Sequence, residues 1–251
     1  MNTKTNSLNR KFGLIGKNIS YSFSQSYFTK KFERENIENT TYQNFDIPAE
    51  NQLKAVLSTR GIVGLNVTIP YKEVIINHLD KIDSQAEEIG AVNTIKIDSN
   101  GKTKGYNTDC YGFKKALIPY LKNHHKMALI LGTGGASKAV AYALKQMGIS
   151  YKMVSRHPEK DQLNYKDLTK NIIVDHKIII NCTPLGTSPN IKTSPDIPYI
   201  HITDNHILYD LIYNPKETLF LTKAIAQGAT AINGLKMLEY QAEKAWEIWN
   251  S

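Results

Sequence analysis

The sequence predicts an α/β protein of two domains, the first built on a mixed sheet and the second on a parallel sheet. Short β-like runs alternate with helix-like runs throughout the 251 residues, and this alternation is typical of sheets with mostly parallel strands. A Gly-rich turn at residues 131–139 restarts the alternation near the middle of the chain. A chain of this length can form two domains that each bury a core.

The first half of the chain is predicted to contain both helices and strands. Phe28 and Phe32 stand four residues apart and predict a helix over 23–35 with one apolar face. The turn Asp98-Ser99-Asn100-Gly101 separates two extended runs and predicts a hairpin. The strands expected here are 11–15, 41–45, 62–69, 91–97 and 102–106. The remaining helices expected are 50–58, 72–79 and 111–121.

A second series of strands and helices follows. The helix expected at 136–147 keeps apolar residues at spacings of three and four. The strands expected are 128–131, 151–155, 177–181 and 206–211, and the other helices are 161–169, 217–227 and 234–249. On the last helix, Trp246 and Trp249 are expected to pack inward, because exposed tryptophan pairs are uncommon on monomers.

Composition narrows the class of partner. The net charge of +8 comes from scattered lysines and arginines, which favours small anions over nucleic acid. Cys110 and Cys182 lie far apart and predict neither a disulfide framework nor a zinc site. Without a signal-like or membrane-spanning apolar run, the protein is expected in the cytoplasm, with no membrane partner.

The turn ALILGTGGASKAVAYAL suits a dinucleotide site. Gly132, Gly134 and Gly135 lie between a strand and a helix, where the backbone can approach a pyrophosphate and the helix N-terminus meets its charge. Ser137 stands where a third glycine is usual. The alternative is a tight turn that uses small residues only for packing.

The end of the next strand distinguishes NADP from NAD. An NAD site usually has an acidic residue there for the ribose hydroxyls, but this chain has Ser155 and Arg156. A guanidinium can bind the 2′-phosphate of NADP through two hydrogen bonds. NADP is therefore favoured, and a solvated surface arginine is the alternative.

Polar residues follow several predicted strands, and each has an ordinary structural explanation. Ser22 and Ser24 could cap a helix, Asn93 could serve a turn, and Lys72 could be a solvated charge. Taken singly, none of them indicates a function.

Taken together, these segments resemble the shikimate dehydrogenase family along almost the whole chain. The matching stretches are GLIGKNISYSFS, GLNVTIPYKE, GAVNT, YNTDCYGF, LGTGGASKA, NCTPLG, DLIYNP and GLKMLEYQA. The resemblance implies an NADP-dependent oxidoreductase that reduces 3-dehydroshikimate to shikimate on the route to aromatic amino acids. It also implies a substrate domain at 1–107, completed by a helix at 234–251, and a Rossmann-like NADP domain at 108–233, with a cleft between them.

The same resemblance assigns roles to residues. Lys72 and Asp109 would be the catalytic pair, and no metal is implied. Ser22 and Ser24 would bind the substrate carboxylate. The other substrate-binding residues would be Asn66, Thr68, Asn93, Asp109, Tyr213 and Gln241. The cofactor-binding residues would be Gly132, Gly134, Gly135, Ala136, Ser137, Ser155, Arg156, Cys182, Thr183 and Gly234.

Several positions depart from the usual motifs. Tyr21 and Gln25 replace the His and Pro that often flank the two serines, and Cys110 replaces a common glycine after Asp109. Ser155 and His157 flank Arg156 where the family usually has Asn and Thr. A buried apolar role is expected for Cys110.

Other functions stay open at this stage. They are a quinate/shikimate dehydrogenase using NAD, a methylenetetrahydrofolate dehydrogenase, and a non-catalytic NADP-binding sensor. The serine and Asn-Thr-Asp motifs argue against the second, and the presence of both Lys72 and Asp109 argues against the third. The protein could be a monomer or a homodimer.

Overall fold

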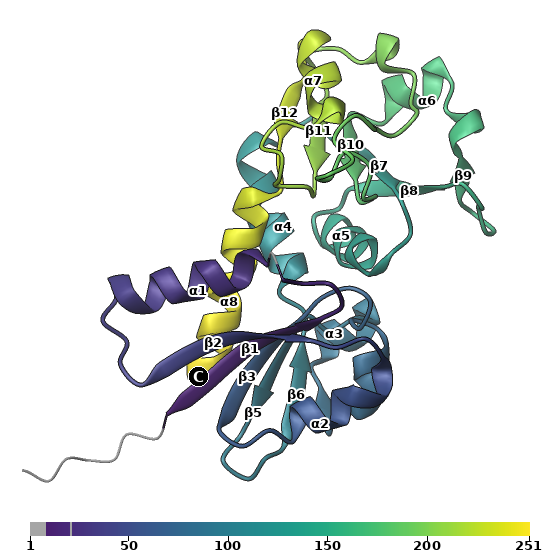
Figure 1. Cartoon of the computed structure of the whole chain (residues 1–251). Coiled ribbons are helices and arrows are strands. Elements are labelled where there is room, and N and C mark those ends of the chain that lie inside the picture. The colour runs from purple at the N-terminus through teal and green to yellow at the C-terminus, as the bar shows by residue number, and fades with distance from the viewer. Residues whose placement is uncertain (1–8, 21) are drawn as a thin grey trace, which may run out of the picture. The chain divides into compact units, whose positions relative to one another are not determined.

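The computed structural model describes residues 9–20 and 22–251, which form two compact units. The first unit consists of the described residues up to Thr108 together with Ala242–Ser251. The second unit is Asp109–Gln241. Figure 1 shows the elements of both units in chain order. Among the described residues, no helix is long and apolar enough to cross a bilayer.

A mixed six-stranded sheet forms the centre of the first unit, in the order β2-β1-β3-β5-β6-β4. Strands β1, β2 and β3 run parallel, whereas β5 is antiparallel to both β3 and β6. The strands are β1 (Arg10–Gly16), β2 (Thr40–Asp46), β3 (Ile62–Val67), β4 (Lys81–Ile82), β5 (Thr94–Ile97) and β6 (Thr103–Tyr106). The α-helices before the second unit are α1 (Phe23–Arg34), α2 (Leu53–Leu57) and α3 (Ser84–Ile89).

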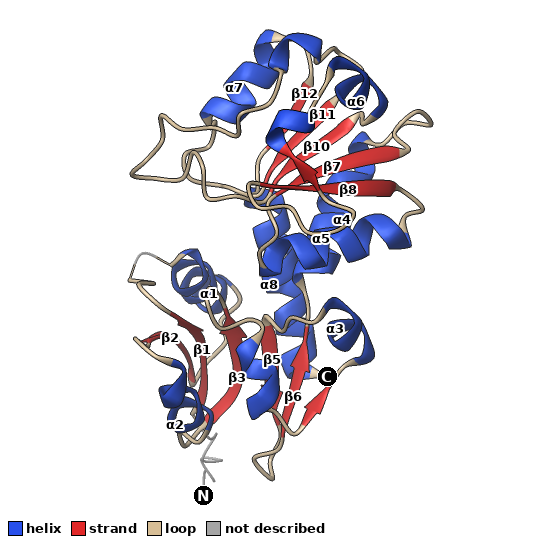
Figure 2. Cartoon of the chain, turned by 90° about the vertical axis from the view of Figure 1, so that its right-hand side faces the viewer, coloured by secondary structure: helices blue, strands red, loops and turns tan. Residues whose placement is uncertain are grey.

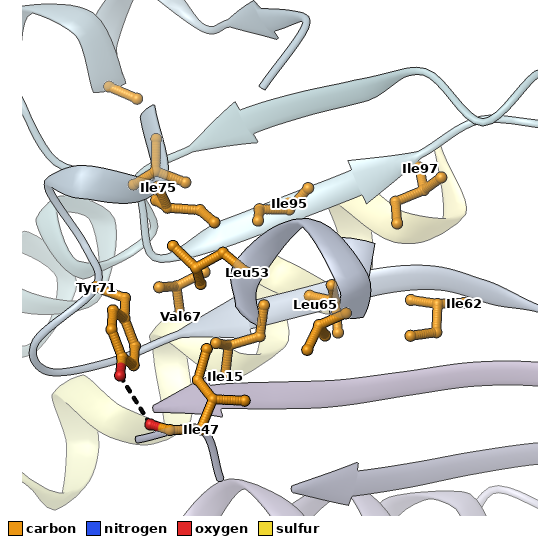
Figure 3. Packing of buried hydrophobic residues seen from close by; sticks show 13 residues of the cluster. Ile15, Ile47, Leu53, Ile62, Leu65, Val67, Tyr71, Ile75, Ile95 and Ile97 are labelled. Carbon is orange, nitrogen blue, oxygen red and sulfur yellow. Dashed lines mark hydrogen bonds between the residues drawn. The ribbon is translucent and has the colours of Figure 1, made fainter. Parts of the chain in front are cut away.

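Both faces of this sheet are covered, because alternate residues of each strand point to opposite sides. On one face, Phe12 of β1 packs with Phe28 of α1 and Trp249 of α8 (Leu235–Asn250). The indole Nε1–H of Trp249 also donates to the Ile95 carbonyl over 2.9 Å. On the other face, Ile15, Leu65 and Ile95 pack against α2 and against the 3₁₀ helix Val74–His78. Figure 3 shows this second cluster, with the Tyr71 hydroxyl donating to the Ile47 carbonyl over 2.7 Å.

The second unit contains a six-stranded parallel sheet in the order β12-β11-β10-β7-β8-β9. This is the order of a doubly wound nucleotide-binding sheet, in which the strand order reverses between the neighbouring parallel strands β7 and β10. The strands are β7 (Met127–Leu131), β8 (Ser150–Ser155), β9 (Leu163–Asn164), β10 (Ile178–Asn181), β11 (Ile207–Asp210) and β12 (Thr230–Ile232). The helices are α4 (Asp109–Leu117), α5 (Gly135–Gln146), α6 (Lys170–Asp175) and α7 (Leu219–Ala226), together with the start of α8.

Helices lie on both faces of the parallel sheet (Figure 2). Residues of β7 and β10 pack with Ile173 of α6 and Phe220 of α7. On α4, the ring of Phe113 meets Tyr209 of β11 edge-on, with ring centroids 5.0 Å apart. The predicted fold class, two α/β domains with one mixed and one parallel sheet, is confirmed.

One predicted helix is wrong. Residues 161–169 form β9 and a 3₁₀ turn over Tyr165–Asp167, and the helix α6 begins only at Lys170. Leu163 pairs with Val154 of β8, and the side chains of Asn164 and Asp167 bond reciprocally to the backbone of this turn. Those local bonds give the backbone an alternative to the helix.

Candidate active site

Four loops of the first unit meet at one edge of the mixed sheet. They lie at the carboxyl ends of β1, β3 and β6 and at the start of the antiparallel strand β5. Asn66 is in register with Thr94, and Thr94 is in register with Tyr106. The Val67 N–H donates to the Asn93 carbonyl over 2.8 Å. The sheet therefore brings together predicted site residues from segments that are far apart in sequence.

A buried hydrogen-bond network joins these loops. The Asn66 amide nitrogen contacts the Asn93 carbonyl at 3.4 Å and Thr94 Oγ1 at 3.3 Å. The Asn93 Oδ1 accepts from the Thr108 N–H over 2.7 Å, and the Asn93 amide nitrogen donates to Thr108 Oγ1 over 3.0 Å. On the other side, the Tyr42 hydroxyl donates to Asn66 Oδ1 over 2.8 Å. Tyr42, Thr94 and Thr108 were not predicted as site residues.

Lys72 and Thr68 lie in the loop after β3, at the same edge. The Lys72 carbonyl accepts from the Val92 N–H over 2.7 Å, which fixes the backbone of Lys72 next to Asn93. The Thr68 N–H donates to the Ile15 carbonyl over 2.8 Å. Both side chains are half-buried, as expected for groups that reach a ligand.

The two predicted carboxylate-binding serines lie at the start of α1. Ser22 is the N-cap of this helix, and its hydroxyl accepts from the Ser24 N–H over 3.2 Å. Ser24 is buried. Capping leaves the Ser22 hydroxyl proton available to a ligand, because the cap uses only the oxygen. Gln25 is exposed, and Tyr21 lies outside the described residues.

Three further predicted substrate residues belong to the second unit. Asp109 is the first residue of α4, is buried, and directly follows Thr108 in the chain. Gln241 is buried on α8, where its Nε2 donates to the Leu238 carbonyl over 3.0 Å. Tyr213 is half-buried in the turn after β11. Cys110 is also buried, and burial raises the pKa of its thiol to about 11, which keeps the thiol protonated and poorly reactive at neutral pH.

The glycine turn after β7 has the geometry that a dinucleotide requires. Gly132 has φ +105°, a conformation that favours glycine, and a Cβ there would lie 3.1 Å from Thr183 Cγ2. Gly134 caps α5 with an ordinary φ of −78°, and a Cβ there would meet no atom within 4 Å. Packing within the protein therefore explains Gly132 but not Gly134. The open space beside Gly134 suits the close approach of a ligand.

The remaining predicted residues of this turn belong to the first turn of α5. Gly135 begins the helix, and Ala136 follows it, half-buried. Ser137 stands in place of the third motif glycine and is fully buried. Its hydroxyl donates to the Gly134 carbonyl over 2.5 Å, so a small residue with a satisfied hydroxyl fits where glycine is usual.

Ser155 and Arg156 lie beside the glycine turn, because β8 is the parallel neighbour of β7. The Gly132 N–H donates to the Val154 carbonyl over 2.9 Å. The Ser155 hydroxyl accepts from the His157 N–H over 3.2 Å and thereby orders the turn. The Arg156 side chain is exposed, and its guanidinium makes no hydrogen bond or ion pair with any residue that the structure describes. It can therefore reach a phosphate.

Cys182 and Thr183 follow β10 on the other side of the glycine turn, and Asn181 holds their loop. The Cys182 N–H donates to the Leu131 carbonyl over 2.9 Å. The Asn181 Oδ1 accepts from both the N–H and the hydroxyl of Thr183, over 3.0 and 2.6 Å. Three strand ends of the parallel sheet thus surround the point where β7 and β10 diverge, the usual ligand position of such sheets.

A buried carboxylate, that of Asp210, holds Asn181 at the start of the loop after β10. Asp210 is fully buried at the end of β11 and accepts from the Asn181 amide over 3.1 Å, the Ile212 N–H over 3.0 Å and the Thr218 hydroxyl over 2.5 Å. Burial raises the pKa of Asp210 to about 6, and the three hydrogen bonds oppose that rise.

Gly234, the last predicted cofactor residue, precedes α8. Its N–H donates to the Ile212 carbonyl over 3.0 Å, and a Cβ there would collide with the Leu211 carbonyl. Close approach of two backbone segments therefore explains this glycine. In the described part of the chain, no group of His, Cys, Asp or Glu side chains could hold a metal ion.

Known proteins resemble the chain over nearly its full length. Residues 14–95 match the family model described as the shikimate dehydrogenase substrate binding domain. A protein of Methanococcus maripaludis named shikimate dehydrogenase (NADP(+)) is 41% identical over 99% of this chain and 92% of the relative.

Two solved structures are similar in fold as well. A crystal structure of a shikimate dehydrogenase in complex with NADP+ has a TM-score of 0.86 and 36% identity, covering 96% of this chain and 90% of the other. A quinate dehydrogenase from Corynebacterium glutamicum in complex with NAD has a TM-score of 0.85 and 28% identity, covering 96% and 93%.

Proposed function

The chain belongs to the shikimate dehydrogenase family, and we propose that it catalyses the reversible NADPH-dependent reduction of 3-dehydroshikimate to shikimate, a step toward the aromatic amino acids. The observation that carries this is the 41% identity to a named NADP(+)-dependent shikimate dehydrogenase over 99% of the chain. The predicted family, fold class and NADP-dependent oxidoreductase activity are confirmed by this match and by the related structures.

The residues around the glycine turn fit NADP. Open space at Gly134 would let a pyrophosphate approach the backbone, and the N-terminus of α5 would attract its negative charge. The exposed Arg156 guanidinium would bind the 2′-phosphate, and Ser155 orders the turn that carries it. Bound NADPH would supply the hydride. Thr183 and Cys182, held by Asn181, would form the wall beside the nicotinamide.

The polar edge of the first unit would bind the substrate. We assign Ser22 and Ser24 to the carboxylate, since each carries a hydroxyl that can donate to it. Asn66, Thr68 and Asn93 would bind ring hydroxyls, and the buried network around the two asparagines fixes their amide groups before a ligand arrives. Such preorganisation lowers the entropy lost on binding. Asp109, Gln241 and Tyr213 complete the proposed set.

Lys72 is the proposed proton donor. Hydride addition to a ketone carbon leaves negative charge on its oxygen, and a nearby ammonium can stabilise that charge and deliver a proton. The Val92–Lys72 backbone hydrogen bond fixes the origin of the lysine side chain, so that its tip searches a limited volume. Asp109 is the proposed carboxylate partner that orients the ammonium group.

A second candidate activity is oxidation of quinate or shikimate with NAD, since a related structure is a quinate dehydrogenase with NAD bound. Arg156 and the lack of a carboxylate beside it at the end of β8 favour NADP over NAD.

One assay separates these activities. The purified chain is incubated with shikimate or quinate, each with NADP or NAD, and reduced nicotinamide is followed by absorbance. The proposal predicts the highest kcat/KM for shikimate with NADP. A preference for quinate and NAD would establish the second activity, and no turnover with any pair would leave a non-catalytic NADP-binding sensor.

We also propose a cytoplasmic protein, monomeric or homodimeric, that works on small molecules without a nucleic-acid or membrane partner. Scattered charge and the absence of a membrane-crossing helix among the described residues support this. Light scattering on the purified protein measures its oligomeric state.

A further inference from the structure

Tyr42 is a buried tyrosine on the edge strand β2, outside every motif that identifies the family. Its side chain is 6% exposed. The ring stacks on Phe28 with centroids 4.7 Å apart and an interplanar angle of 13°, and it also lies near Trp249. This packing holds the ring in one position, so its hydroxyl is fixed in space.

The Tyr42 hydroxyl donates its single proton to Asn66 Oδ1 over 2.8 Å. Burial raises the pKa of Tyr42 well above its ordinary value, so the hydroxyl remains a donor at neutral pH. Tyr42 thus donates to a residue of the proposed substrate site, Asn66.

The hydroxyl also determines which way the Asn66 amide faces. With Oδ1 toward Tyr42, the amide nitrogen faces the Asn93 carbonyl and Thr94 Oγ1 at 3.4 and 3.3 Å. These two contacts are long, whereas the bond from Tyr42 is of ordinary length. Asn66 is only 4% exposed, so water cannot readily replace a lost donor at Oδ1.

We propose that Tyr42 is a positioning residue for substrate binding, which orients the Asn66 amide by donating to its oxygen. It acts through Asn66 and does not touch the substrate. The inference rests on the proposed function, because Asn66 binds substrate only if that function is correct.

Tyr42→Phe tests the proposal, because it removes the hydroxyl and keeps the stacked ring. We expect KM for shikimate to rise about tenfold, equivalent to one lost interaction of about 1.4 kcal/mol. We expect KM for NADP and kcat to stay within about twofold of wild type, because the change lies in substrate binding alone. Circular dichroism checks that the fold is kept.

Tyr199→Phe is the matched control in the second unit. It also removes one hydroxyl, which donates to the Pro195 carbonyl over 2.8 Å, and keeps the contact of the ring with Phe220. A purely structural loss would alter the two variants alike, whereas positioning predicts a shikimate KM change in Tyr42→Phe only.

A double-mutant cycle identifies the route of the effect. If Tyr42 acts through Asn66, then Tyr42→Phe should raise KM for shikimate much less in an Asn66→Ala background than in wild type. Equal increases in both backgrounds, or no increase in the single variant, would overturn the inference. If the wild-type protein itself has no activity with shikimate, the proposed function fails, which is a distinct result.

Discussion

Asp210→Asn gives a sharp test of the energetics of the cofactor unit. The substitution keeps the shape of the side chain and removes its charge. The Asn oxygen can still accept from the Asn181 amide and the Ile212 N–H, and its amide nitrogen can donate to the Thr218 hydroxyl oxygen. Packing and hydrogen-bond number are therefore preserved, and only the titration of the buried carboxylate is lost.

The magnitude follows from the pKa of Asp210. Its folded-state pKa is about 6, against an ordinary value of 3.8. Each unit of difference corresponds to about 1.36 kcal/mol, so the full effect is about 3 kcal/mol. At pH values between about 3.8 and about 6, Asp210 holds a proton in the folded protein that it has released in the unfolded chain. The free energy of unfolding of the wild type therefore falls as pH rises through this window, and Asp210→Asn lacks this fall.

Urea unfolding followed by circular dichroism, at pH values from about 4 to about 7, measures the effect. The unfolding free energy of Asp210→Asn minus that of the wild type should rise by about 2 kcal/mol across this range, somewhat less than the full effect, because the unfolded carboxyl is already more than half ionised at pH 4. Titrations shared by both proteins cancel in the difference. Asp175→Asn, which removes an exposed carboxylate at the end of α6, should show no such trend. A difference that stays constant with pH, or falls, would refute the reasoning.

Three other substitutions test separate features. Lys72→Ala should lower kcat at least about a hundredfold, the low end of general acid–base contributions, and should leave KM for NADP little changed. Near-normal turnover would show that Lys72 is only a surface charge. Arg156→Ala should raise KM for NADP about tenfold or more, since charge-assisted hydrogen bonds are worth about 1.5–3 kcal/mol. It should leave KM for NAD nearly unchanged. Equal increases in the two KM values would contradict the proposed contact of Arg156 with the 2′-phosphate. Gly64→Ala should destabilise the first unit by about 1–3 kcal/mol through overpacking, because a Cβ would overlap the Trp249 indole; unchanged urea unfolding would contradict this packing.

Much of the fold could be predicted because local pattern and tertiary role agree. The buried strand β7 and the apolar stripe of α5 were found from hydrophobic runs and their spacing. The packing of Trp249 into the core was also predicted correctly. Helix α3 was missed although Asp83 caps its start and Gly90, with φ 70°, ends it, a signal visible in DSQAEEIG. Strands β4, β9 and β12 have two or three residues each, too few for a periodic pattern.

Only the site residues that lie within local sequence motifs could be predicted from the sequence. The glycine turn and the arginine after β8 carry their chemistry in local sequence, and the structure places them side by side. Tyr42, by contrast, reaches Asn66 across the intervening strand β1, since both β2 and β3 pair with that strand. No local sequence pattern near Tyr42 or Asn66 predicts the hydrogen bond between them. The same holds for Asp210, whose partner Asn181 is 29 positions away.

The sharing of α8 between the two units has a consequence for biosynthesis. Asp109–Gln241 is one uninterrupted stretch, so it can close its core as soon as it has left the ribosome. The strands made first must wait, because Ala242, Ala245 and Trp249, which cover Phe12 and Phe28, are translated after that entire stretch. During this delay the part of the apolar sheet face that α8 covers is exposed to solvent. Truncated or stalled chains that lack α8 should therefore be prone to aggregation and should depend on chaperones. This holds even though every strand of the mixed sheet is already present.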